Sequence, residues 1–245
     1  MLNTALRTAE RIIFRGLRPL LRGGRPRYHR SLLMERYCQG KGAEIGAFAT
    51  PSHVPFGSSS IYIDRVPASH WSDDPEYAGI KLVDPDILDD GSRLSKVESS
   101  SLDYLVASHV LEHVDDPVSA LKNWIRVVKP GGHVVVIVPD KRFTFDSPRE
   151  VTTTAEMIAD HLEGPRNEPH YREVAEKCMG LTSDADIQAF VDKAEPAIHF
   201  HTFTMESFLA FLVEAKTRFD LPFEIVSSHL NVAEDVAVLK VVAED

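Results

Sequence analysis

The most restrictive feature of the sequence is a strand, a helix and a second strand in immediate succession. Residues 102–108 and 133–138 are mostly apolar, as in strands buried on both faces of a parallel sheet. Between them, Asp116 and Pro117 are residues favoured at a helix start, and apolar residues follow at helical spacing. Two buried strands connected by a helix through short loops predict a right-handed parallel crossover.

Other apolar runs predict the rest of an α/β fold. Strands are expected at residues 43–46, 60–64, 81–84, 223–226 and 236–242, and a helix at 204–218. A short helix is expected at 31–37, after a break at Gly23–Pro26. The polar residues 140–201 are expected to form a helical cap for substrate recognition, inserted after the strand at 133–138. The alternation predicts one domain, 31–245, with a doubly wound, mainly parallel sheet of seven strands.

Charge divides the chain into two parts. Residues 1–30 contain eight arginines and one acid, for a net charge of +7, whereas the remaining residues sum to −17. Such an acidic body excludes nonspecific nucleic-acid binding by the domain. Apolar residues at near-helical spacing make the arm a basic amphipathic helix, which either docks on the body or lies on an anionic membrane surface. The arm also loosely resembles an organelle presequence.

Composition limits the cellular compartment and the kinds of cysteine site that can be expected. No apolar run approaches the ~20 residues that span a bilayer. The two cysteines, Cys38 and Cys178, are far apart and form no C-x-x-C pair, so neither a disulfide framework nor a cysteine zinc site is expected. Two thiols in a chain of 245 residues fit a reducing, cytoplasmic environment.

A glycine and several acids follow the first expected strands, at the edge where open α/β sheets bind ligands. Gly46 permits a tight turn and a close approach of the backbone to a ligand. Asp64 ends the second strand, where a carboxylate can accept hydrogen bonds from a ribose diol. Acids near the third expected strand can accept from an adenine amino group; they are Asp84, Asp86, Asp89 and Asp90. The pattern predicts a ligand that contains adenosine and little phosphate.

Five pieces of sequence, taken in order, resemble a known family. They are Glu44–Gly46, Asp64, Asp86, Ala107–Val114 and Lys129–Gly132. This order resembles class I S-adenosylmethionine-dependent methyltransferases over residues 41–245. Pro139–Asp146 resembles a bacterial subgroup of methyltransferases, some of which are attached to glycosyltransferases. The resemblance implies a Rossmann-like methyltransferase fold and methyl transfer from S-adenosyl-L-methionine.

The resemblance also implies roles for the residues that follow the first two strands. Glu44, Gly46 and Ala47 would line the methionine end of the cofactor, and Asp64 would hold its ribose hydroxyls. The family's Gly-x-Gly-x-Gly loop keeps one glycine here, in Gly46–Thr50. That departure leaves open an alternative function, a noncatalytic S-adenosylmethionine-binding or scaffold domain.

Further roles follow from the later pieces of the resemblance. Asp86, with the backbone of Ile87, would face the adenine, and Ser108 and His109 would close over the cofactor. Methyl transfer requires a collinear nucleophile, methyl group and sulfur, and an oxygen or nitrogen acceptor can also need a base. The candidates for this catalytic role are His109, His113, Asp140, His199 and His201. Basic side chains of the expected cap would recognise a glycan or a small polar or anionic acceptor.

His109, Glu112 and His113 also match the H-x-x-E-H zinc pattern. That pattern requires all three side chains on one helix, together with a distant ligand. Here His109 directly follows an expected strand, and the helix start at Asp116 comes only afterwards. We therefore predict no metal site.

Overall fold

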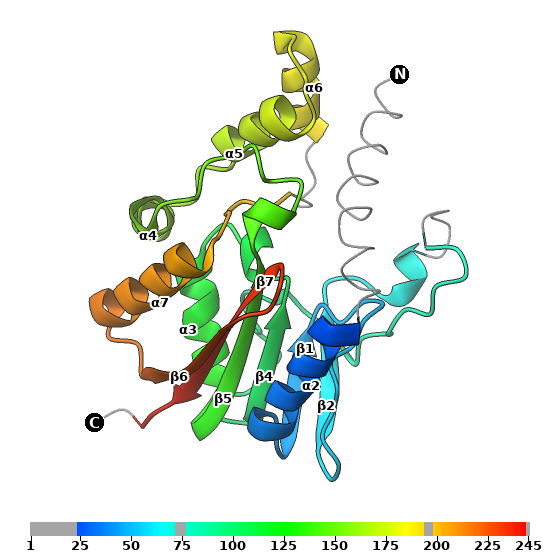
Figure 1. Cartoon of the computed structure of the whole chain (residues 1–245), viewed down its shortest axis with the longest axis vertical. Helices are drawn as coiled ribbons and strands as arrows, with labels where there is room; N and C mark the ends of the chain where they lie inside the picture. The colour runs from blue at the N-terminus through cyan, green and yellow to red at the C-terminus, as the bar shows by residue number, and fades with distance from the viewer. Residues whose placement is uncertain (1–23, 72–76, 194–197, 244–245) are drawn as a thin grey trace.

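The computed structural model describes residues 24–71, 77–193 and 198–243 (Figure 1). The predicted basic arm lies almost entirely outside the described residues. The strands are β1 (Lys41–Ile45), β2 (Ser59–Asp64), β3 (Ile87–Leu88), β4 (Leu102–Ser108), β5 (Val128–Pro139), β6 (Phe223–Leu230) and β7 (Glu234–Val241). The helices are α2 (Gly24–Tyr37), α3 (Pro117–Val127), α4 (Thr154–Glu163), α5 (Asn167–Glu173), α6 (Asp184–Lys193) and α7 (Met205–Phe219). Shorter turns are η1 (Ala68–Trp71), η2 (Leu111–His113), η3 (Lys141–Phe143) and the π-helical η4 (Val174–Cys178).

All seven strands form one sheet, in the order β3-β2-β1-β4-β5-β7-β6. Strands β1 to β5 run parallel to one another, and β7 is antiparallel to both β5 and β6. Ile45 pairs with Ile63 on one side and with Ala107 on the other, so the carboxyl ends of β1, β2 and β4 meet at one edge. The prediction of a mainly parallel seven-stranded α/β sheet is confirmed.

Helices cover the sheet on its two faces (Figure 1). Leu105 and Ala107 of β4 belong to a core cluster with buried residues of α3, α4 and α7. Tyr104 and Val106, which alternate with them along the strand, pack in a second cluster with Met34 of α2. Burial on both faces is the reason that β4 and β5 read as nearly continuous apolar runs.

Two predicted boundaries are wrong. The third strand was expected at 81–84, but the N–H of Val83 donates to the carbonyl of Phe48 at 2.7 Å, and β3 pairs with β2 only through Ile87 and Leu88. The strand expected at 133–138 begins earlier, at Val128, because this residue, directly after the last residue of α3, is already extended.

The helix expected at 31–37 begins earlier, at Gly24, so the predicted break does not separate Gly24–Pro26 from it. Proline is tolerated in a first helical turn because the N–H groups there have no acceptor within the helix. The predicted domain boundary between residues 30 and 31 therefore falls inside α2.

Helices α4, α5 and α6 occupy the segment between β5 and α7. Helix α4 packs against α3 and α7, whereas α5, η4 and α6 form their own apolar cluster around Tyr171, Phe190 and Phe200. In Figure 1, α5 and α6 project beyond the sheet at its upper end. None of the described helices has the length and apolar character needed to cross a membrane.

Candidate active site

The residues predicted for the methionine end of a cofactor lie together where β1 ends. The buried Glu44 carboxylate accepts from the N–H and the hydroxyl of Ser52, at 2.9 and 2.8 Å. Burial raises the pKa of Glu44, and these hydrogen bonds oppose the rise. Gly46 then turns the chain with φ of 66°, a conformation that costs glycine little, and Ala47 is buried behind it. The N–H of Gly46 donates to the carbonyl of Ile63 at 2.9 Å, which fixes the turn against β2.

Asp64 ends β2, as predicted, with a partly exposed side chain whose Oδ1 accepts from the N–H of Arg65 at 2.7 Å. Asp86 lies elsewhere. Because β3 begins at Ile87, Asp86 comes before the strand, and its carboxylate accepts from the N–H of Tyr62 at 2.8 Å. The structure therefore does not bring the Asp86 carboxylate to the ligand edge, and Ile87 is a strand residue packed against the core.

Two acids that follow β3 lie at the ligand edge in place of Asp86. Asp89 is buried, and its Oδ1 accepts from the hydroxyl of Ser95 at 2.8 Å, so it shapes the loop. Asp90 is exposed, and its Oδ1 accepts from the N–H of Ser92 at 2.8 Å. Asp90, also one of the acids considered in the sequence analysis, therefore has an accessible carboxylate at this edge.

The loop after Asp90 is held closely against the end of β1. The carbonyl of Gly91 accepts from Nε1 of the fully buried Trp124 at 2.7 Å. A Cβ at Gly91 would lie 2.4 Å from Cγ2 of Ile45, so a larger residue cannot fit without a shift of the loop. This packing keeps Asp90 near the Gly46 turn.

β4 ends at Ser108, and His109 continues the chain with φ of 55°, which is unusual for a residue with a side chain of this size. Its Nε2 lies 3.0 Å from Oε1 of Glu234, and its Nδ1 lies 3.5 Å from Oε1 of Glu112. Arg30 binds Glu234 from the other side, with Nε 2.9 Å from Oε2. Because both ring nitrogens face carboxylates, His109 is poorly placed to accept a proton from a substrate.

Beyond β4, Glu112 and His113 of η2 meet His199; we call these three residues the Glu–His–His cluster. One ligand atom from each side chain lies within 4.8 Å of the other two. Nδ1 of His113 is 2.9 Å from the carbonyl of Ile198, and burial, together with the neighbouring His199, lowers the pKa of His113 to about 3. Burial also raises the pKa of Glu112, whose side chain is fully buried. The N–H of Phe200 donates to the Glu112 carbonyl at 2.7 Å, which holds the two segments together.

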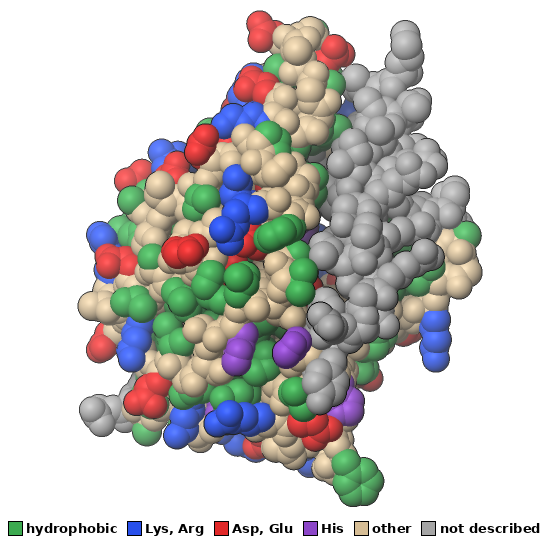
Figure 2. All heavy atoms as spheres, viewed as in Figure 1, with side chains coloured by type: hydrophobic (Ala, Val, Ile, Leu, Met, Phe, Trp, Pro, Cys, Tyr) green, Lys and Arg blue, Asp and Glu red, His purple; other side chains and the backbone are tan. Residues whose placement is uncertain are grey.

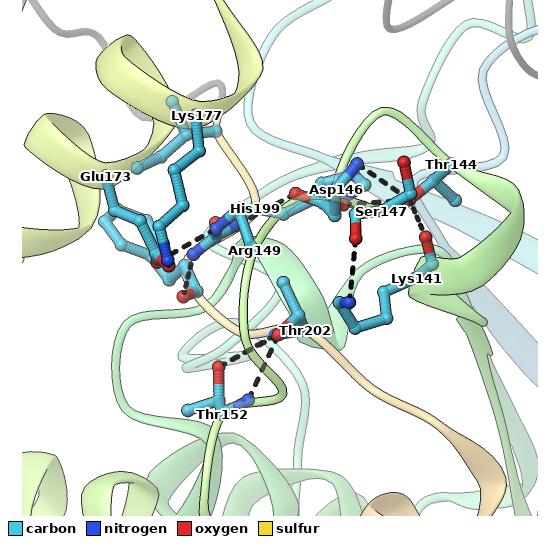
Figure 3. Close-up of polar contacts among 12 residues, drawn as sticks. Lys141, Thr144, Asp146, Ser147, Arg149, Thr152, Glu173, Lys177, His199 and Thr202 are labelled. Carbon is cyan, nitrogen blue, oxygen red and sulfur yellow. Dashed lines mark hydrogen bonds and ion pairs between the residues drawn. The ribbon is translucent and has the colours of Figure 1, made fainter.

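A buried Arg149–Asp146 pair contacts His199, one member of the cluster (Figure 3). Oδ2 of Asp146 is 2.5 Å from Nδ1 of His199, and Oδ1 accepts from Arg149 at 2.9 Å. Arg149 also donates to the carbonyls of His199 and Phe200, at 2.7 and 3.1 Å, and to Glu173 of α5 at 3.0 Å. Burial alone would raise the pKa of Asp146, but the His199 hydrogen bond and the Arg149 charge lower it.

The two remaining predicted catalytic residues lie outside the cluster. Asp140 is buried, and Nε of Arg142 lies 2.9 and 3.0 Å from its two carboxylate oxygens. His201 is also buried and belongs to a second group with Asp160 and His170. Of the five candidates, the structure therefore brings His113 and His199 together.

Sequence reasoning missed three functional side chains. Glu112 was noted only as part of the zinc pattern, and Asp146 only as the end of a block of resemblance. Arg149 belonged to the basic set expected to meet the acceptor, but it is 2% exposed and already bound to two carboxylates. Asp146 and His199 are 53 residues apart, and no local pattern indicates such a pair.

Comparisons with known proteins bear on the fold and the class of domain. The sequence model of a family described as "Methyltransferase domain" matches residues 49–136. A chain from the complex between the Haloferax volcanii Trm112 methyltransferase activator and the putative methyltransferase is 11% identical, with a TM-score of 0.53, over 98% of this chain and 96% of that one. A structure described as putative zinc-dependent alcohol dehydrogenases from Rhodobacter sphaeroides is 14% identical, with a TM-score of 0.53, over 90% and 91% of the two chains.

The trans-methyltransferase CalH, solved in complex with SAH, is 16% identical with a TM-score of 0.47, and the match covers 88% of this chain. It covers 55% of the CalH chain, so this protein spans about half of that length. No curated protein sequence gave a significant match. The domain match and the sheet order support a class I S-adenosylmethionine-dependent methyltransferase, with S-adenosylmethionine as the cofactor.

Proposed function

We propose that this protein transfers the methyl group of S-adenosylmethionine to an oxygen or nitrogen of a small polar acceptor, such as a glycan hydroxyl. The observation that carries the proposal is the position of the Glu–His–His cluster beside the Gly46 turn. A Cβ at Gly46 would lie 3.4 Å from Cγ2 of Val110, which precedes η2 by one residue. The expected cofactor edge and the cluster are therefore neighbours.

The residues at the edge of the sheet suit this cofactor. Asp64 ends β2, and Asp90 follows the adjacent strand β3 by two residues. Both carboxylates are accessible, and they suit a ribose diol and an adenine amino group. Gly46 and Gly91 let the backbone approach closely. S-adenosylmethionine supplies a methyl group on a positively charged sulfur, and the buried Glu44 and its neighbours would line that end.

The Glu–His–His cluster would handle the acceptor. An acceptor hydroxyl loses its proton as the new bond to the methyl carbon forms and the bond from that carbon to sulfur breaks. The hydrogen bonds of His113 and His199 to described residues use Nδ1 and leave Nε2 available, whereas both nitrogens of His109 lie beside carboxylates. We assign orientation and ionisation of the acceptor to this cluster.

The charges around the site favour a polar acceptor over a strongly anionic one. Three of the basic side chains that were expected to bind an anion already contact carboxylates; they are Arg142, Arg149 and Arg172. Over helices α4 to α6, the face seen in Figure 2 carries interspersed acidic and basic side chains and no large basic patch. A basic patch is the feature that would attract a polyanion.

Calorimetric titration with S-adenosylmethionine and with S-adenosylhomocysteine tests the proposal, beside Asp64→Asn. Loss of a charged hydrogen-bond acceptor should weaken binding about ten- to a hundredfold, on the order of 1.5–3 kcal/mol. Asp220→Asn is the matched control, because Asp220 is exposed at the end of α7 in a left-handed conformation that Asn tolerates. Equal binding by the two variants would contradict the assignment of Asp64.

A radiolabelled methyl-transfer screen then tests the acceptor class. Glycans, small hydroxylated metabolites and amines should include the acceptor, whereas proteins and nucleic acids should remain unlabelled. Cofactor binding without turnover of any acceptor would favour the noncatalytic alternative.

A further inference from the structure

The Glu–His–His cluster has the composition and geometry of a metal site. Its three side chains come from two segments 86 residues apart, Glu112 and His113 in η2 and His199 near the start of α7. Their ligand atoms lie within 4.8 Å of one another. One carboxylate and two imidazoles form a common ligand set for zinc and other first-row divalent ions.

Hydrogen bonds fix both imidazoles in the orientation that a metal ligand needs. Nδ1 of His113 faces the carbonyl oxygen of Ile198 at 2.9 Å. A carbonyl only accepts, so Nδ1 carries the hydrogen and Nε2 keeps its lone pair. Nδ1 of His199 faces Asp146 in the same way, at 2.5 Å. Metal-bound histidines characteristically donate their other N–H to a carbonyl or a carboxylate.

Glu112 provides the independent observation. Its side chain is fully buried, and no described residue donates a hydrogen bond to either carboxylate oxygen. Nδ1 of His109 lies 3.5 Å from Oε1 of Glu112, but the Nε2 of the same ring already contacts Glu234. A buried carboxylate without donors is costly, and a bound cation would compensate its charge.

We propose that Glu112, His113 and His199 bind one divalent transition-metal ion of the zinc type. Asp146 and the Ile198 carbonyl would orient the two imidazoles, and Arg149 would hold Asp146 in place. His109 is not a ligand, because its Nε2 is bound to Glu234. The proposed ligand set is therefore not the H-x-x-E-H pattern, and the proposal departs from the prediction of no metal site.

The role of the ion rests on the proposed function, whereas its binding does not. Three protein ligands leave a tetrahedral ion one open position. An acceptor hydroxyl at that position would have its pKa lowered by the ion, as metal-bound water does. The ion would thus orient the acceptor and promote its ionisation beside the cofactor edge.

The test measures metal binding directly, on the full untagged chain. The protein is stripped with a chelator, reloaded with Zn²⁺, and its bound metal is determined by mass spectrometry, with Co²⁺ absorption as a second probe. The wild type should bind one ion per chain. His199→Asn and Glu112→Gln should each weaken Zn²⁺ binding at least tenfold, and Asp146→Asn, which only orients a ligand, by about ten- to a hundredfold.

The second group, Asp160, His170 and His201, supplies the matched control. In that group Asp160 already has Arg166 beside it, with Nε at 3.9 Å, so its charge is partly compensated. His170→Asn should keep the ion. If it loses the ion while His199→Asn keeps it, or if folded wild type binds no Zn²⁺, the proposal is wrong.

Binding of S-adenosylmethionine, measured on the same samples, separates the two proposals. Cofactor binding without Zn²⁺ binding would overturn the metal site and leave the proposed methyl transfer standing. Zn²⁺ binding without cofactor binding would overturn the proposed methyl transfer and leave the metal site standing. Circular dichroism of each variant establishes that it is folded. Co²⁺ d–d absorption bands that appear with the wild type but not with His199→Asn would locate the ion at the cluster, independently of any change in stability.

Discussion

At the scale of single residues, Asp235 shows how burial and a neighbouring carboxylate change the pKa of one carboxyl group. Its side chain is buried at the start of β7, and no described residue donates a hydrogen bond to it. Desolvation, together with the charge of Asp140, raises the pKa of Asp235 to about 7. The native state therefore keeps this proton between about pH 4 and 7, where the unfolded chain has lost it.

We predict that Asp235→Asn removes this pH dependence. Because the native state binds more protons than the unfolded state in this range, wild-type stability falls as pH rises from 4 to 7. The variant should be more stable than the wild type by about 2 kcal/mol at pH 8, after allowance for solvent screening, and nearly equal at pH 4. Urea unfolding across this range measures the difference, and Asp220→Asn should show no such trend. A constant difference between Asp235→Asn and wild type would contradict the prediction.

The position of a candidate residue was predictable where it directly follows the end of a buried strand. Glu44, Gly46 and Asp64 follow directly from the ends of buried strands, and the structure places them at one edge. The position of Asp86 relative to the strand was not predictable, because β3 has only two residues, too few for a periodic pattern. Asp146 could not be assigned, because its partner His199 is brought to it only by the folded chain.

At the scale of elements, Arg149 links three segments. It joins Asp146, the His199 and Phe200 carbonyls, and Glu173 of α5, while it is itself buried. A buried arginine whose three nitrogens all donate to carboxylates or carbonyls positions the segment that carries His199. Its removal leaves Asp146 without its buried guanidinium partner, although His199 still contacts the other carboxylate oxygen.

Arg149→Met is expected to lower the free energy of unfolding by about 3–5 kcal/mol, the usual cost of breaking a buried ion pair. Arg172→Met is the matched control. Arg172 is more exposed and binds Glu168 one helical turn away, and pairs of this kind contribute about 0–1 kcal/mol. Chemical denaturation of both variants provides the comparison. Equal losses would mean that Arg149 does not hold the segment.

The positions of the most deeply buried helices and strands were the easiest to predict from sequence. The apolar runs of β4 and β5 and the capped start of α3 gave nearly correct positions, because each is dictated by local pattern. Helices α5 and α6 could not be located from sequence, since their apolar residues form a small cluster of their own and the segment is mostly polar. The expected function of this segment in recognising the acceptor stays a prediction.

At the scale of the whole molecule, one ion-pair chain joins distant parts of the sequence. Arg30 of α2, Glu234 of β7 and His109 after β4 meet at the carboxyl end of the sheet, although Arg30 and Glu234 are 204 residues apart. The chain fastens α2 to the sheet beside the proposed active site. Burial alone would raise the pKa of Glu234, but the His109 hydrogen bond and the Arg30 charge outweigh it and lower the pKa to about 2.

A lowered carboxyl pKa makes stability depend on pH in the direction opposite to Asp235. The contribution of Glu234 is fully present above the pKa of about 4.3 that a glutamate has in the unfolded chain, and it is lost as pH falls from there toward 2. Wild type should therefore exceed Glu234→Gln in stability by about 2–3 kcal/mol at pH 6, and this difference should shrink steadily between pH 4 and pH 2.5. Glu224→Gln, at an exposed position of β6, should differ little from wild type throughout. Denaturant unfolding at each pH provides the measurement. A difference that persists unchanged to pH 2.5 would show that Glu234 contributes through packing, and that its charge does not fasten α2 to the sheet.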